Sequence, residues 1–234
     1  MNMLHRLIGM AAISAVAALA GGCATSNTPG DPLEGFNRGV FGFNEGVDQA
    51  IVKPIAKGYT AVVPEPARDC VRNVFANIED IFNGINSLLQ GMVVDAGSDV
   101  GRLAVNSTVG VLGCFDVASK MGLEKHNRDF GQTFGKWGMA TGPYLVIPFI
   151  GVSNLRDGIG NAIYSSLDPV WARHVPTRNT AFALRMVSRR AGSLDASALI
   201  DDTALDKYQF VRDAYLQRRR SMVDDGAASK VESK

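Results

Sequence analysis

The sequence predicts a mainly α-helical protein built as a single domain, and three observations point to this fold class. Apolar residues recur at three- and four-residue intervals through most of the chain, which is the periodicity of amphipathic helices. No internal repeat and no linker rich in Gly and Ser divides residues 32–220. The 234 residues, 46% of them hydrophobic, are enough to bury a core without a framework of disulfides.

The charge and composition of the chain exclude two classes of protein. A formal net charge of +1 argues against a partner nucleic acid, because nucleic-acid-binding proteins usually carry a basic excess. The hydrophobic fraction excludes a wholly disordered chain.

Residues 1–22 have the composition of a cleaved signal peptide. A short basic start with Arg6 is followed by an apolar stretch over 7–19 and then by small residues. The uncharged part, Leu7 to Gly22, is shorter than the roughly 20 residues that a membrane-spanning helix needs. We therefore expect these residues to direct export and to be removed.

Cys23 follows the small residues and is the expected site of lipid attachment. The segment Ala20-Gly21-Gly22-Cys23 resembles a lipobox, although leucine is commoner at the position of Ala20. Ala24 is not the aspartate that commonly retains a lipoprotein at the inner membrane, so the rule implies export to the outer membrane. The alternative is an ordinary signal with an incidental cysteine. If lipidated, residues 23–31 form a tether to a membrane that this segment does not span.

The first half of the remaining chain predicts a series of helices. Phe36, Val40, Phe43, Val47 and Ile51 share one helical face, which Pro54 should end or kink. The expected elements after this proline are a linker over 59–66, a helix over 65–77, helical spacing over 81–89 and an amphipathic helix over 95–105.

The segment 110–160 is rich in glycine and contains an uncharged run, Pro143 to Ile150. Two prolines in this run argue against a regular helix or a central strand. A buried hairpin, a membrane-contacting loop and an ordinary core segment remain open as interpretations.

The last third of the chain returns to helical spacing. We expect helices over 177–191 and 205–220, a short element over 197–200, and a disordered tail over 221–234. The run Arg218-Arg219-Arg220 and the five arginines within 163–193 are either solvated or face phosphate headgroups.

The residue types that carry catalysis or bind metals do not form a recognisable pattern. The mature chain has two histidines, His126 and His174, without zinc-ligand spacing, and it has no nucleophile elbow and no phosphate-binding loop. We expect no enzyme activity, no metal and no cofactor; an unrecognised pair such as Asp129 with His126 is the remaining catalytic alternative. Cys70 and Cys114 could form a disulfide in an oxidising periplasm or remain buried thiols.

Several motifs, in one consistent order, resemble the MlaA (VacJ) lipoprotein family over about residues 31–220. They are Asp31-Pro32-Leu33-Glu34-Gly35-Phe36-Asn37-Arg38, Phe43-Asn44, Asn86-Ser87-Leu88-Leu89-Gln90-Gly91, Asn106-Ser107-Thr108-Val109-Gly110, Phe115-Asp116-Val117-Ala118, Asp129-Phe130-Gly131-Gln132-Thr133, Gly142-Pro143-Tyr144, Leu155-Arg156-Asp157, and a closing helix over 208–219.

The resemblance implies a ring-shaped helical lipoprotein in the inner leaflet of the outer membrane, associated with a porin trimer. An amphipathic channel through the ring would pass misplaced phospholipids inward to the periplasmic carrier MlaC, which maintains lipid asymmetry. The alternative is a structural lipoprotein that scaffolds porins or the envelope without moving lipid.

Two segments are the candidates for lipid or membrane contact, because they are apolar and nearly uncharged. The candidate residues are Phe36, Asn37, Phe41, Phe43, Asn44, Tyr144, Leu145, Val146, Ile147, Phe149 and Ile150.

Overall fold

A computed structural model describes residues 31–170 and 174–232 of the chain. The expected signal peptide and the expected lipid attachment site, Cys23, lie outside the described residues. None of the described helices combines the length and the apolar composition needed to cross a membrane.

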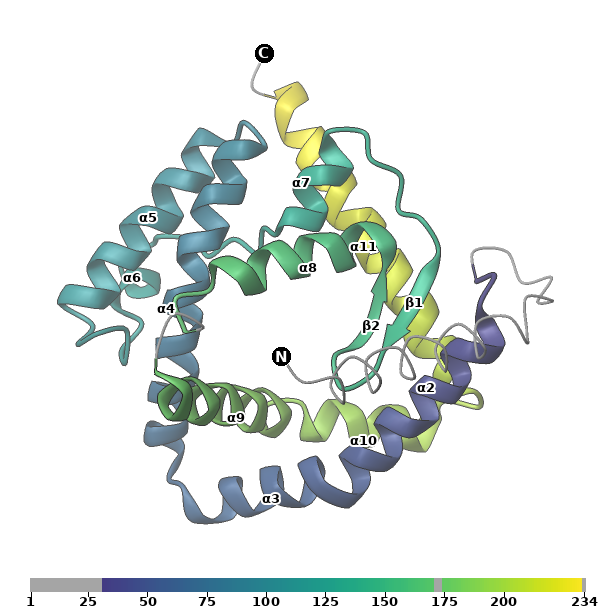
Figure 1. Ribbon diagram of the computed structural model, residues 1–234. Coiled ribbons are helices and arrows are strands. Elements are labelled where there is room, and N and C mark those ends of the chain that lie inside the picture. Colours follow the sequence, from purple (N-terminus) through teal and green to yellow (C-terminus); the bar gives the residue numbers. More distant parts are fainter. Residues whose placement is uncertain (1–30, 171–173, 233–234) are drawn as a thin grey trace, which may run out of the picture.

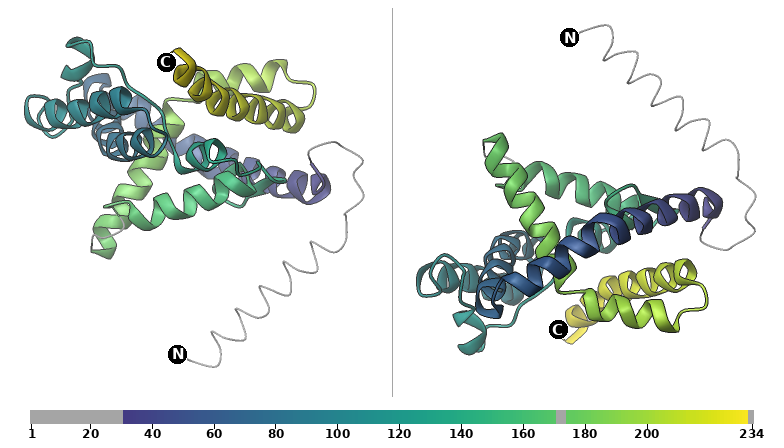
Figure 2. Two further views of the ribbon diagram at one scale, coloured as in Figure 1. Left: turned by 90° about the horizontal axis from the view of Figure 1, so that it is seen from above. Right: turned by 90° about the horizontal axis from the view of Figure 1, so that it is seen from below.

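The described residues form a mainly helical ring, as expected. Figure 1 shows one side formed by α2 and α3, a second by α4 to α6, and a third by α7, the hairpin and α11. Figure 2 shows α10 and α11 on one side of the layer that contains α2 and α3, with the end of the α8–α9 pair projecting from the other. The elements are α2 (Glu34–Val47), a π-helical turn η1 (Asp48–Val52), α3 (Lys53–Val62), α4 (Glu65–Leu89), α5 (Val93–Thr108), α6 (Val117–Lys120), α7 (Phe130–Lys136), β1 (Tyr144–Ile147), β2 (Gly151–Asn154), α8 (Leu155–Leu167), α9 (Val175–Ala191), α10 (Leu194–Thr203) and α11 (Lys207–Glu232).

Pro54 does not end the first helix. The chain passes from α2 through η1 into α3, and Pro54 takes up the start of α3. A proline lacks the N–H that bonds one turn back, and its ring crowds the carbonyl four residues earlier. The wider π-helical turn immediately before α3 accommodates both effects. The expected linker over 59–66 is correspondingly reduced to Val63 and Pro64.

One boundary agrees with the expectation and one differs from it. Helix α4 runs without a break from Glu65 through Leu89, so the helical spacing over 81–89 continues the helix expected over 65–77. Helix α11 continues to Glu232, so the tail expected to be disordered from 221 begins as helix. Met222 accepts a long hydrogen bond from Gln132, and Val223 lies against Gly135 of α7. These contacts extend the helix although the sequence there has no apolar periodicity.

The uncharged run forms a hairpin, which was one of the three interpretations left open. Strands β1 and β2 are antiparallel, and Tyr144 lies opposite Asn154. Pro143 and Pro148 lie just outside β1, where neither removes a hydrogen bond within the ladder. Phe149 has a φ of 63° and Gly151 a φ of 104°, so the turn uses the left-handed region twice.

Most of the buried side chains are polar or charged, and many large apolar side chains are exposed. Among the described residues, buried polar and charged side chains outnumber buried hydrophobic ones by about two to one. In soluble proteins charged residues are rarely buried unless they are paired. The described helices are therefore held together largely by paired polar groups.

Arg102 of α5 is the most buried arginine among the described residues and is 2% exposed. Its guanidinium donates to both carboxylate oxygens of Asp116 at 3.1 Å, to Ser119 Oγ at 2.9 Å and to the Leu123 carbonyl at 2.7 Å. Its Nε lies 3.5 Å from a carboxylate oxygen of Asp80 in α4. One side chain thus joins α4, α5 and the segment around α6.

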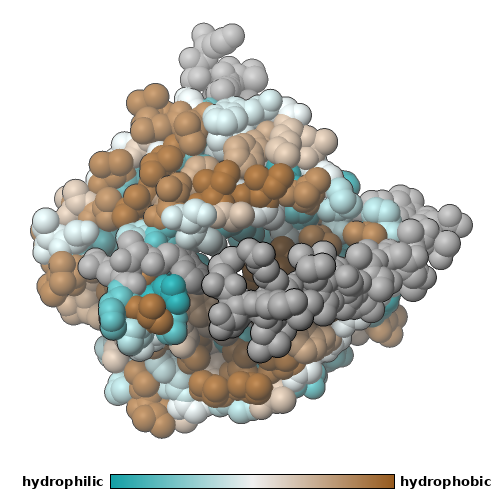
Figure 3. All heavy atoms as spheres, viewed as in Figure 1, coloured by the Kyte–Doolittle hydropathy of each residue, from teal (hydrophilic) through white to brown (hydrophobic). Residues whose placement is uncertain are grey.

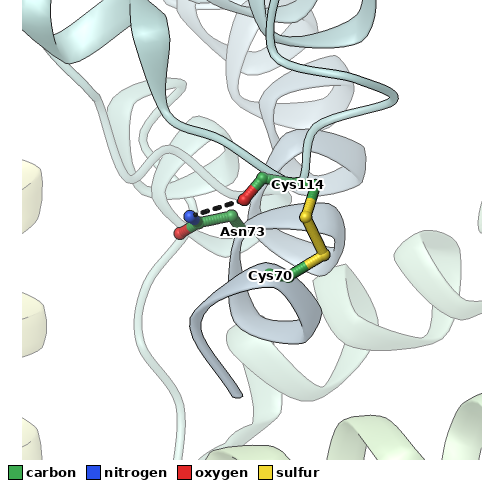
Figure 4. The surroundings of a disulfide bond; sticks show 3 residues. All are labelled: Cys70, Asn73 and Cys114. Carbon is green, nitrogen blue, oxygen red and sulfur yellow. Dashed lines mark hydrogen bonds between the residues drawn. A yellow bond between two sulfur atoms is a disulfide. The ribbon is translucent and has the colours of Figure 1, made fainter. Parts of the chain in front are cut away.

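A disulfide joins α4 to the turn that follows α5. Cys70 and Cys114 are bonded with an S–S distance of 2.06 Å, and Asn73 Nδ2 donates to the Cys114 carbonyl at 3.1 Å (Figure 4). The bond closes a loop across a sequence separation of 44. The disulfide therefore holds the first turns of α4 against the turn that follows α5.

Removal of the buried guanidinium should destabilise the protein strongly. Arg102→Ala leaves Asp80 and Asp116 without their shared partner, and breaking such a pair costs about 3–5 kcal/mol of unfolding free energy. Chemical denaturation followed by circular dichroism measures this loss. Arg72→Ala is the control, because Arg72 is 64% exposed at its side chain and forms an exposed ion pair with Asp69. Equal losses in both variants would contradict the role of Arg102.

Removal of the disulfide should lower the unfolding free energy by about 2–4 kcal/mol, because the unfolded chain regains the freedom of the closed loop. The double variant Cys70→Ser/Cys114→Ser and the reduced wild-type protein should show the same shift in denaturation midpoint. An oxidised protein no more stable than either would show that the bond does not brace the fold.

Candidate functional site

The hairpin lies between α2 and α11 (Figure 1), and buried aromatic side chains hold it there. Tyr144 and Val146 of β1 form a core with Tyr208 of α11. The ring of Tyr208 also meets Phe41 of α2 edge to face, with 5.6 Å between ring centroids. The hairpin is therefore packed on both neighbouring helices.

Two asparagines of α2 bind the backbone of the hairpin in the manner of a neighbouring strand. Asn37 donates to the Tyr144 carbonyl at 3.1 Å and accepts from the Val146 N–H at 2.9 Å. Asn44, two helical turns later on the same face, donates to the Ile147 carbonyl at 3.0 Å and accepts from the Phe149 N–H at 2.8 Å. Each carboxamide thus satisfies one donor and one acceptor of the exposed strand edge.

Asp31 fixes the point at which the expected tether enters the ring. This carboxylate is fully buried, accepts from Asn37 Nδ2 at 2.8 Å and from the Tyr208 hydroxyl, and lies 3.7 Å from Arg212. Burial and the hydrogen bond to Asp31 raise the pKa of Tyr208 above its usual value, so Tyr208 remains a hydrogen-bond donor. The chain directly after the tether is therefore immobilised beneath the hairpin.

A second buried network joins the end of the hairpin to three helices. Asp157 of α8 accepts from Asn154 at 2.5 Å, from the Tyr215 hydroxyl at 2.7 Å and from Arg219 at 2.9 Å. Arg219 also donates to Asp129 at 2.6 Å. Burial alone would raise the pKa of Asp129, but the hydrogen bonds and charge of Arg219 outweigh it, and the pKa is lowered.

The arginines expected to be solvated or to face headgroups are in several cases paired inside the protein. Besides Arg219, Arg185 binds Asp168 at 2.6 Å and Arg190 binds Asp48 at 2.7 Å. Asp129 does not meet His126, whose Nδ1 lies 3.1 Å from Asp99 instead. The structure therefore does not bring together the catalytic pair considered from the sequence.

The candidate contact residues divide into an inner and an outer group. Asn37, Tyr144 and Val146 are buried in the core, so their roles in this structure are to hold the hairpin. The partly buried candidates are Phe36, Phe41, Asn44, Leu145 and Ile147.

The outer group consists of Phe43, Phe149 and Ile150, which are 49%, 68% and 70% exposed. Phe43 and Phe149 stack edge to face with 5.3 Å between ring centroids. This hairpin tip, as we name these three residues, is an uncharged aromatic surface at the end of β1.

Sequence reasoning missed two further apolar surfaces. Leu155, Ile159 and Leu167 are exposed along α8, where Figure 3 shows a band of apolar atoms. Their spacing of four and then eight residues, which places them on one helical face, was the available signal. The turn after α5 exposes Val111 and Leu112, both with positive φ; no local pattern predicts that conformation, because such residues rarely adopt it.

Comparison with known proteins gives consistent results over most of the chain. The family model of the MlaA lipoproteins matches residues 29–222. The intermembrane phospholipid transport system lipoprotein MlaA of Shigella flexneri is 35% identical over 215 residues, covering 88% of this chain and 84% of that protein. Its Escherichia coli K12 counterpart is 34% identical with the same coverage. A solved chain from work on the structural basis for maintenance of bacterial outer membrane lipid asymmetry superimposes with a TM-score of 0.73 and 31% identity, covering 82% of this chain and 98% of that one.

Replacement of Asn44, the second asparagine that binds the hairpin backbone, should make the hairpin tip more mobile. Asn44→Ala removes two hydrogen bonds to the turn, which should cost about 1–3 kcal/mol and speed amide exchange there by roughly tenfold or more. Hydrogen–deuterium exchange of the peptide covering 143–151 measures this opening. Gln49→Ala, which removes only an exposed hydrogen bond to Glu45, should leave exchange unchanged; equal exchange in wild type and Asn44→Ala would refute the clamp.

Proposed function

Because this chain belongs to the MlaA lipoprotein family, we propose that it takes misplaced phospholipids from the outer leaflet of the outer membrane and passes them to the periplasmic carrier MlaC. The observation that carries the proposal is the arrangement of the ring, with polar side chains buried and apolar side chains exposed. A phospholipid needs polar groups along the path of its headgroup and an apolar surface along the path of its tails.

The exposed apolar surfaces support a position within the lipid layer on the periplasmic face of the outer membrane. Each square ångström of apolar surface removed from water contributes about 25 cal/mol. The apolar residues of α8, the turn after α5 and the hairpin tip would be stabilised by acyl chains and are unfavourable in water. Association with a porin trimer would cover part of the same exterior.

The lipobox-like segment supports lipid attachment at Cys23, and the fixed position of Asp31 limits how far the ring can lie from that anchor. A tether over 23–31 reaches at most about 30 Å when fully extended, at 3.3–3.6 Å per residue. The acyl chains would therefore hold the ring close to the membrane surface. Because several acyl chains bind far more tightly than one, the anchored protein would not exchange between membranes.

The hairpin tip and α8 are the proposed surfaces for the lipid tails, and the channel enclosed by the ring is the proposed path of the headgroup. Transport of this kind requires no bond to be broken, so the protein would act without catalysis. The competing proposal is a structural lipoprotein that binds porins and moves no lipid. Both proposals predict that a porin copurifies with the protein, so only lipid distribution separates them.

Surface-exposed phospholipid should rise in a strain that lacks this gene and return to normal with the wild-type gene. Cys23→Ser should fail to restore it, because the protein loses its anchor. Ile150→Asp should also fail while the porin still copurifies, because a charge at the hairpin tip is unfavourable against acyl chains. Labelling of outer-leaflet phospholipid in whole cells measures all three.

Leu205→Asp is the matched control, since Leu205 is fully exposed between α10 and α11 and is not one of the hairpin-tip residues. It should restore the wild-type lipid distribution. Normal outer-leaflet phospholipid in the deletion strain would reject the transport function, and full activity of Ile150→Asp would reject the role of the hairpin tip.

A further inference from the structure

A cavity of about 250 Å³ lies beside the start of α8, and the function proposed above does not use it. Its walls come from the turn at Thr141 and Gly142, from Arg156 of α8 and from the last part of α11. In Figure 1 this is the region where α7, α8 and α11 converge. Three of the lining side chains are arginines.

Arg156 is a buried guanidinium with unused donors. The residue is 4% exposed, and its Nε donates to Asp157 at 3.1 Å. Neither terminal nitrogen makes a hydrogen bond or ion pair to the part of the chain that the structure describes. A Cβ at Gly135 of α7 would come within 2.7 Å of Nη1, so this glycine leaves the space that the guanidinium occupies. Its terminal nitrogens are therefore donors that an acceptor in the cavity, water or an anion, can use.

Among the residues that line the cavity, arginines outnumber acidic residues by three to one, and two further carboxylates lie behind the wall. Arg219 is already held by Asp129 and Asp157, neither of which lines the cavity. Arg220, the next residue of α11, lines the cavity from an exposed position. Asp224, one turn further along α11, is the single acidic residue among those that line the cavity.

The start of α8 contributes a positive potential but no free donor. A helix carries a partial positive charge at its N-terminus. The first N–H groups of α8 are already bonded to the Pro143 and Thr141 carbonyls and to the Asn154 side chain. An anion in the cavity would therefore be bound by the guanidinium groups of Arg156 and Arg220.

We propose that this cavity binds a phosphate group, either of a phospholipid headgroup or free in the periplasm. The planar fork of an arginine matches two oxygens of a phosphate, and such charge-assisted pairs are among the strongest hydrogen bonds in proteins. The volume admits a phosphate ester but not the acyl chains of a phospholipid, whose tails would remain outside. The interpretation that the phosphate belongs to a lipid headgroup rests on the proposed function. The binding of a phosphate group as such does not.

The test is calorimetric titration of the purified full-length protein in detergent micelles with inorganic phosphate and with dihexanoyl phosphatidylglycerol. Arg156→Gln and Arg220→Gln should each weaken the binding by roughly tenfold or more, since each removes a charge-assisted contact. Arg218→Gln is the matched control: Arg218 is an exposed arginine of the same helix that does not line the cavity, and its affinity should equal that of wild type. Tighter binding of the short-chain lipid assigns the site to headgroups, and equal binding of both ligands assigns it to phosphate itself.

The proposal is overturned if neither ligand binds the wild-type protein, or if Arg220→Gln binds as tightly as wild type. The second criterion uses Arg220 because this residue is exposed, and its replacement should leave the protein folded. Replacement of the buried Arg156 could instead lower affinity by destabilising the fold. The titration requires no transport. The phosphate proposal can therefore be rejected by the titration while the deletion strain still shows disturbed lipid asymmetry. Conversely, phosphate can bind even if lipid asymmetry in the deletion strain is normal.

Discussion

The fold depends on the pairing of buried polar groups. Arg102 joins α4, α5 and the α6 segment, Arg219 joins α7, α8 and α11, and the asparagines of α2 bind the hairpin. Each pairing compensates for the cost of removing charge or amide groups from water, and loss of one partner leaves that cost unopposed. Directional contacts of this kind also fix the relative positions of helices more narrowly than apolar packing does.

The pairing of polar groups in the interior also explains why so many apolar side chains are exposed. Because polar networks occupy much of the buried interior, many apolar side chains of α4, α5, α8 and the hairpin tip are left exposed. Such surfaces are a liability for a protein in water and an advantage in contact with acyl chains. The proposed lipid transport uses both halves of this arrangement, since a phospholipid carries one polar and one apolar part.

Local patterns in the sequence predicted the helices but not the direction in which their faces point. The spacing of Phe36, Val40 and Phe43 identifies a helix, yet it cannot say whether that face meets a core or a lipid. Tyr144 and Val146 were candidates for lipid or membrane contact, with a buried hairpin as an alternative, and they are buried. The partners of Arg219 lie 62 and 90 residues away, and no local rule connects them. The ring shape was predicted from the order of the family motifs. That order carries information on long-range contacts, which the periodicity of apolar residues lacks.

The central claim is that the apolar exterior contacts acyl chains, and quenching of tryptophan fluorescence by brominated lipids tests it most directly. In a background with Trp137→Phe and Trp171→Phe, single probes are placed by Leu88→Trp and Ile150→Trp on the apolar exterior and by Gln217→Trp on the exposed polar face of α11. The account predicts strong quenching by acyl-chain bromine at the first two positions, with acrylamide quenching strongest at the third. Equal quenching by bromine at all three positions, or none at Leu88→Trp and Ile150→Trp, would contradict it.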